Sequence, residues 1–272
     1  MTEGSKSRNV RKVFLLTTAL WSLGWYWKIL YYLKILGANS VAPPQVSLLP
    51  AAMSDYRLAL GFYLLPVVGI LVVLVRWSRE RALMASGAMV VGALGCMGHY
   101  QFYNDATFVT SFWVALWLFW LAWNSEREDQ GLIREARGLA KGTVALIFLG
   151  GAVGKFTGTY WSGEVLHDIY FQQKDYFIYN FLRESWTAEQ VEQLAILFSR
   201  MAILGEVAVV VAALVLSYRH FAILVVVTVL SMVLISTPYL FSVMGAVVGL
   251  MGANLFWGEQ KGERLAPGGR SD

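Results

Sequence analysis

The chain has 272 residues, of which 57% are hydrophobic and only 15% are charged. Soluble domains carry about a quarter charged residues, so this composition indicates a protein built for a lipid bilayer. The net charge of +4 does not indicate nucleic-acid binding, because the basic residues gather in short segments between apolar stretches. The single cysteine, Cys96, excludes an intrachain disulfide, a CxxC redox pair and a metal site built from cysteines.

Several apolar stretches are long enough to cross a bilayer core, which takes about 20 helical residues. The first is long and aromatic and lacks a small-residue cleavage site, so it indicates a retained anchor. We therefore expect an all-α polytopic transmembrane bundle that forms a single domain over residues 1–257, followed by a disordered cytoplasmic tail over 258–272. About eight spans are predicted, at residues 13–35, 57–76, 83–101, 106–124, 140–156, 191–217, 221–237 and 239–257. If the segment 236–238 kinks one helix instead of turning between two, seven spans remain.

The basic residues predict the orientation of the bundle. Most of the 22 Lys and Arg fall on one side of an eight-span arrangement, in the N-terminal segment, the even-numbered connections and the tail. By the positive-inside tendency that side is cytoplasmic, with both termini inside. The protein is thus expected to be integral to a bacterial inner or plasma membrane.

The segment 157–190, on the opposite side, mixes aromatic with charged residues. This alternation is typical of amphipathic helices that lie at a membrane interface or pack over the mouth of a bundle, so an extracytoplasmic cap is predicted here. Thr187 and Gln190 have the spacing of a capping box at the start of the sixth span. The same aromatic residues are candidates for a surface that binds a protein partner.

Lys155 ends the apolar run that begins at Val144, and Tyr160 and Trp161 follow it. An ammonium group at the edge of a bilayer is costly unless it reaches water, pairs or reacts. Lys155 could serve as a base or an anion binder. Alternatively, it simply ends the helix and extends its side chain to the surface. A base requires the neutral amine, and a carboxylate near enough to form an ion pair would favour the charged form and oppose this role.

Other polar residues lie at or near membrane depth. Glu206 falls inside the sixth predicted span, so its carboxylate must pair, stay protonated or face a wet cavity. It is either a proton-handling or ligand-orienting acid, or one half of an interhelical salt bridge. His99 ends the third span and is either a proton shuttle or a headgroup anchor. Arg200 is expected to be interfacial and structural, and Lys28 is expected to extend its ammonium to the outer surface.

Common catalytic motifs are absent: the chain has no P-loop, no HExxH and no GxSxG. Its three histidines are too scattered for a haem or zinc site, so no metal is predicted. The Trp-rich run 113–123 has helical spacing and is expected to face the core or lipid. Gly245, Gly249 and Gly252 predict close helix packing in the last span.

Two segments carry a resemblance to a known family. They are Gly154-Lys-Phe-Thr-Gly-Thr-Tyr-Trp-Ser-Gly163 and Gly98-His-Tyr-Gln-Phe-Tyr-Asn-Asp105, with an intramembrane Gly205-Glu206 pair in a later span. Together they resemble the membrane domain of the vitamin K-dependent γ-glutamyl carboxylase and its bacterial HTTM relatives, over about residues 55–255. The large lumenal domain that follows the helices of the carboxylase has no counterpart in this sequence.

The resemblance implies a quinone or isoprenoid-lipid pocket on the outer face, with a quinol such as reduced vitamin K as cofactor. Lys155 matches the position of a lysine proposed as the base in the carboxylase. His99 and Glu206 would be its proton partners, and Tyr160, Trp161 and Tyr100 would contact the cofactor.

Two functional hypotheses follow. The first is a carboxylase-like integral membrane protein with lysine-base chemistry, for which the reaction class stays open between a γ-carboxylase-like lyase or ligase and a quinol-dependent oxidoreductase. The alternative is a non-catalytic membrane subunit of an export, maturation or redox complex, which binds its protein partner through segment 157–190.

Overall fold

The computed structural model describes residues 3–37, 56–98, 106–127, 130–235 and 241–255. Every regular element in these residues is a helix, so the predicted all-α class is confirmed for the described chain. The long helices are α1 (Glu3–Gly37), α2 (Tyr56–Val75), α3 (Arg79–Gly98), α4 (Ala106–Trp123), α5 (Gln130–Lys155), α8 (Ala188–Val215), α9 (Tyr218–Ile235) and α10 (Phe241–Leu255). Three short elements lie between α5 and α8: α6 (Gly158–Trp161), the π-helix η2 (Leu166–Gln172) and α7 (Phe177–Ser185).

Six of the described helices, α1 to α5 and α8, are long and apolar enough to cross a membrane. The described apolar parts of α9 and α10 are shorter, at Tyr218–Met232 and Gly245–Leu255. Length and composition thus support an integral membrane protein with six candidate spans, and the seventh and eighth spans stay predictions. The turn predicted at 236–238 and the tail predicted from 258 lie outside the described residues.

Helix α5 begins at Gln130, ten residues before the predicted start of the fifth span. The sequence analysis placed Arg137 and Lys141 between the fourth and fifth spans, which is wrong because both residues lie within α5. Their side chains contact neighbouring helices. The guanidinium of Arg137 donates to the carbonyl of Asn254 in the last turn of α10 (3.1 Å). The ammonium of Lys141 donates to the carbonyl of Leu216 at the end of α8 (2.7 Å). Basic side chains here satisfy carbonyl groups that have no partner within their own helix.

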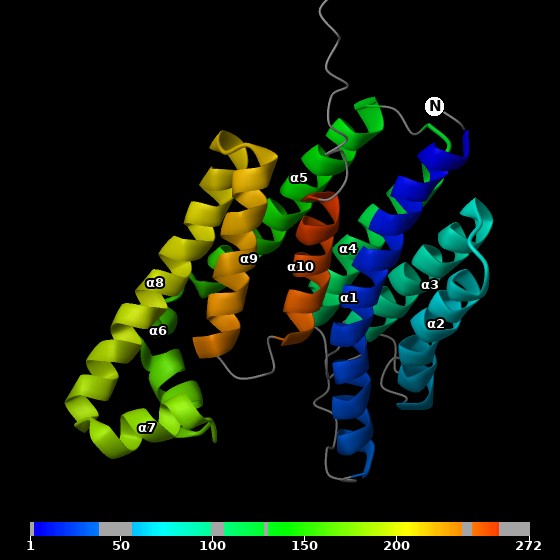
Figure 1. The fold of residues 1–272 in the computed structure, drawn as a ribbon. Helices are drawn as coiled ribbons and strands as arrows, with labels where there is room; N and C mark the ends of the chain where they lie inside the picture. The colour runs from blue at the N-terminus through cyan, green and yellow to red at the C-terminus, as the bar shows by residue number, and fades with distance from the viewer. Residues whose placement is uncertain (1–2, 38–55, 99–105, 128–129, 236–240, 256–272) are drawn as a thin grey trace, which may run out of the picture.

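The first and last described helices, α1 and α10, pack closely against each other (Figure 1). Glycines allow this approach, because a Cβ at Gly245 would lie 2.3 Å from the carbonyl oxygen of Leu20. A Cβ at Gly249 would lie 3.0 Å from the Cβ of Leu20. A Cβ at Gly252 would meet nothing within 4 Å. The predicted close packing is confirmed at the first two glycines and is wrong at Gly252.

Two further expectations concern side chains in the bundle. Trp117 of the Trp-rich run is buried, and its indole N–H donates to the carbonyl of Ala136 (3.0 Å), so this residue packs in the core. Lys28 does not extend to the surface as predicted, because it is only 8% exposed and its ammonium lies 5.6 Å from the centre of the Phe108 ring. The ring face offers a partially negative surface to the cation.

The segment 157–190 forms a small helical cap against one end of α8 (Figure 1). Arg183 of α7 donates hydrogen bonds to the carbonyl groups of Phe171 and Lys174, which ties α7 to η2. The predicted helices of this segment are thereby confirmed, as is the capping box of Thr187 and Gln190, in which both hydrogen bonds are formed. The cap has a hydrophobic cluster of its own, made of Phe171, Tyr179, Leu182, Val191 and Ala195.

Candidate functional site

Two of the three predicted catalytic residues come together where the end of α5 meets the middle of α8. Lys155 is the last residue of α5, and Glu206 lies in the middle of α8. The Nζ of Lys155 is 2.6 Å from Oε1 of Glu206, which is the distance of a charge-assisted hydrogen bond. The side chains are 27% and 9% exposed, respectively. The pair therefore sits at the boundary between the interior and the surface of the bundle.

The space for the carboxylate comes from a glycine on α5. A Cβ at Gly151 would lie 3.1 Å from each carboxylate oxygen of Glu206, which is tighter than ordinary contact. Gly151 precedes Lys155 by four residues, so both lie on the same face of the helix. This face provides the gap for the carboxylate and, one turn later, the cation that pairs with it.

Only one of the two carboxylate oxygens is satisfied. Oε1 of Glu206 accepts from Lys155, whereas Oε2 is buried and has no hydrogen-bond partner among the described residues. A buried polar atom without a partner is costly, and such atoms in folded proteins call for an explanation. Glu206 thus presents an unused acceptor beside a fixed positive charge.

Tyr160 of α6 lies close to the ion pair. The hydroxyl of Thr157 accepts from the backbone N–H of Tyr160 (3.3 Å), which starts the single turn of α6 directly after α5. The Lys155 ammonium is 5.9 Å from the centre of the Tyr160 ring. Burial raises the pKa of the Tyr160 phenol, and the negative charge of Glu206 raises it further. The phenol therefore keeps its proton at neutral pH and is available as a hydrogen-bond donor.

Trp161, predicted beside Tyr160 as a pocket wall, lies against Arg200 of α8. The guanidinium carbon is 5.3 Å from the centre of the indole ring, and Nε donates to the Trp161 carbonyl (3.4 Å). Gly163 allows this close approach of α6 to α8: its φ is +84°, and a Cβ there would lie 2.6 Å from the backbone nitrogen of Ile196. A side chain at residue 163 would be strained in that conformation and would collide with α8.

The remaining predicted site residues, His99 and Tyr100, lie outside the described residues. No group of three or more His, Cys, Asp or Glu side chains in the described chain is arranged to hold a metal ion. Gly151 was missed by the sequence analysis. The only signal was the Gly150-Gly151 pair one turn before Lys155, and a sequence cannot show that the second glycine faces a carboxylate from another helix.

The ion pair bears directly on the chemistry expected of Lys155. A base needs a free lone pair on the amine, whereas an ammonium that donates to a carboxylate at 2.6 Å uses its charged form. Among the described residues of this site, Oε2 of Glu206 is a buried acceptor without a donor. The geometry therefore opposes a lysine base and favours a carboxylate acceptor held in place by a cation.

Comparison of the chain with protein-family models, with curated proteins and with solved structures returns no match. The resemblance to the carboxylase family thus remains a prediction from two segments of sequence, one of which includes the undescribed residues 99–105.

Proposed function

We propose that the protein binds the polar head of a quinone-type lipid at the Lys155–Glu206 ion pair, where the end of α5 meets the middle of α8. The observation that carries this proposal is the buried Oε2 of Glu206, which lacks a partner in the described chain. A quinol hydroxyl is a donor that would satisfy this oxygen once a small shift of the Glu206 side chain exposes it. The same group would bring its tail into the bilayer beside the helices.

Each polar residue of the site has a role in this proposal. Glu206 accepts the hydrogen bond of a quinol hydroxyl and is the proton acceptor. Lys155 pairs with the carboxylate and holds it in position. Tyr160, with its proton retained, donates to a second oxygen of the head group. The bound lipid supplies two-electron, two-proton redox chemistry, so the reaction class that this site supports best is quinol-dependent.

The surroundings of the pair suit an isoprenoid tail. Phe156 follows Lys155 directly, at the end of α5, and its side chain is 62% exposed. Exposed apolar side chains of this kind on membrane helices face lipid. A head group held at the ion pair would therefore have apolar surface within one helical turn.

The test is retention of a short-chain menaquinone by the full-length protein in mild detergent, measured by mass spectrometry of the bound lipid. We expect the wild type to retain the quinone and Glu206→Gln to bind it about tenfold more weakly or worse, since a hydrogen bond to a charged acceptor contributes roughly 1.5–3 kcal/mol. Glu192→Gln changes an exposed glutamate on the same helix and should behave as wild type. Equal retention by Glu206→Gln and wild type would rule out the site.

Breaking one side of a buried ion pair also lowers stability, because it leaves the other charge uncompensated. The double variant Lys155→Gln/Glu206→Gln removes both charges and separates this effect from binding. We expect the double variant to recover part of the melting temperature lost by Glu206→Gln and still to fail to retain the quinone. Recovery of quinone retention together with stability would show that the carboxylate has no binding role.

A second candidate, the non-catalytic membrane subunit, is favoured by the aromatic face of α7. Phe177 and Phe181 are 67% and 59% exposed and lie four residues apart, on one side of the helix. Exposed aromatic residues are enriched in surfaces that bind proteins. In the same purification, a stoichiometric protein partner without any quinone would favour this function over the first.

A further inference from the structure

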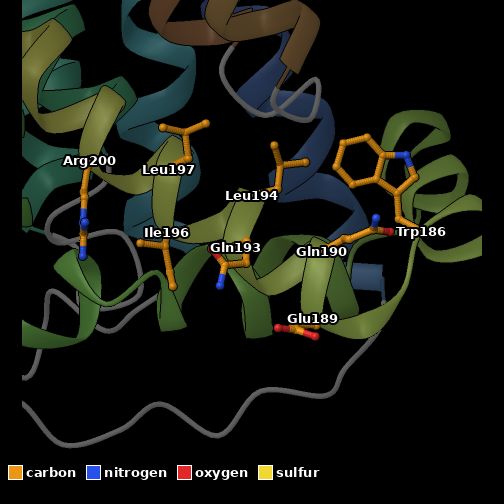
Figure 2. A pocket seen from close by; sticks show the side chains of 8 residues that line it. All are labelled: Trp186, Glu189, Gln190, Gln193, Leu194, Ile196, Leu197 and Arg200. Atoms are coloured by element: carbon orange, nitrogen blue, oxygen red, sulfur yellow. The ribbon is translucent and has the colours of Figure 1, made fainter.

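The outer half of α8 carries a second polar feature, separate from the ion pair. An open groove of about 740 Å³ runs along residues 186–200. Figure 2 shows its two sides: one is mostly polar, with Arg200, Ile196, Gln193 and Glu189, and the other is mostly apolar, with Leu197, Leu194, Gln190 and Trp186. A groove with one polar and one apolar side fits an amphipathic ligand better than a fully polar one.

Arg200 is held in a fixed orientation at one end of this groove. It lies over the Trp161 ring, and its Nε donates to the Trp161 carbonyl. Its two terminal nitrogens have no hydrogen-bond or ion-pair partner among the described residues, and the side chain is exposed. A guanidinium positioned in this way presents a planar pair of donors that matches the oxygens of a phosphate group.

The apolar side of the groove continues along α8 beyond Arg200. Leu197, Met201 and Leu204 are all exposed, and their spacing of four and then three residues places them on one face of the helix. This face runs from the groove further along α8, which is long and apolar enough over Ala188–Val215 to cross a membrane. The cation and the apolar face therefore lie end to end, as the head and the chains of a lipid do.

We propose that the groove binds an anionic phospholipid, with the phosphate on Arg200, the polar head group beside Gln193 and the acyl chains along Met201 and Leu204. This inference goes beyond the quinone site, because it uses a different cation and a different ligand. Glu189 does not oppose it: the carboxylate lies eleven residues from Arg200, about 16 Å along the helix, which exceeds the screening length of about 8 Å at physiological salt.

The experiment titrates delipidated full-length protein in detergent with phosphatidylglycerol and measures bound lipid by native mass spectrometry. We expect binding of phosphatidylglycerol to exceed that of phosphatidylcholine. Arg200→Gln should weaken phosphatidylglycerol binding about tenfold or more. Phosphatidylglycerol binding by Arg200→Lys should fall between that of the wild type and that of Arg200→Gln, because lysine keeps the charge and loses the planar donors. Arg76→Gln changes an exposed arginine outside the groove and should have no effect.

Equal binding of the two lipids, or no effect of Arg200→Gln, would overturn the proposal. Competition by millimolar inorganic phosphate would also overturn it, because a soluble anion would then be the ligand. Menaquinone retention by Arg200→Gln separates the two proposals: retention at the wild-type level with loss of phosphatidylglycerol supports the lipid groove, whatever the outcome of the Glu206→Gln test. A variant with an unchanged melting temperature confirms that the loss of binding is local.

Discussion

At the scale of single residues, Gly151 decides whether the carboxylate of Glu206 fits between α5 and α8. An added Cβ would lie 3.1 Å from both carboxylate oxygens, so either the carboxylate or the helix must shift. We expect Gly151→Ala to lengthen the Lys155–Glu206 ion pair and to cost about 1–2 kcal/mol of stability through overpacking. Quinone retention by this variant should fall together with its stability. The melting temperature and the retention assay measure the two effects.

Gly150 is the matched control for this change. It lies next to Gly151 in the same helix, it is exposed, and an added Cβ would meet nothing within 4 Å. Gly150→Ala should therefore be neutral or stabilise the protein by up to about 1 kcal/mol through the better helix propensity of alanine. If both variants lose the same stability and retain the same reduced amount of quinone, the proximity of Gly151 to Glu206 has no functional meaning.

At the scale of helices, the contact of α1 with α10 depends on glycine. A Cβ at Gly245 would lie 2.3 Å from the backbone oxygen of Leu20, and backbone cannot move aside as a side chain can. Gly245→Ala should force the two helices apart and cost about 2 kcal/mol or more. The check is the melting temperature in detergent.

Gly252→Ala provides the comparison within the same helix. No atom lies within 4 Å of the position that its Cβ would take, so we expect a change within about 1 kcal/mol of wild type. The three glycines look alike in the sequence, and only the position of α1 distinguishes Gly245 from Gly252. Similar losses in both variants would contradict close helix contact as the cause.

At the scale of the whole molecule, the predicted orientation can be tested with single cysteines. Cys96 is 1% exposed and should not react with a membrane-impermeant maleimide, so it provides a silent background. Ser162 follows α6 in the cap, and Ser217 lies between α8 and α9; both are exposed. In intact cells we expect Ser162→Cys to react and Ser217→Cys to react only after permeabilisation. The reverse pattern would invert the orientation.

The sequence by itself determined the helical class, six of the candidate spans, the helices of the cap and the capping box at Thr187. These features follow from composition, apolar run length and local hydrogen bonding, which need no knowledge of distant residues. The sequence also identified Lys155 and Glu206 one at a time, because an ionisable group at membrane depth is conspicuous on its own.

Only the tertiary structure decided what these residues do to one another. The ion pair joins positions 51 residues apart in the chain, and the contact of Trp161 with Arg200 joins positions 39 apart. Such pairings depend on which faces of α5, α6 and α8 meet, and helical periodicity does not specify the partner of a face. The same reason explains the corrections at Lys28, Arg137 and Lys141, whose side chains are held by helices that are remote in sequence.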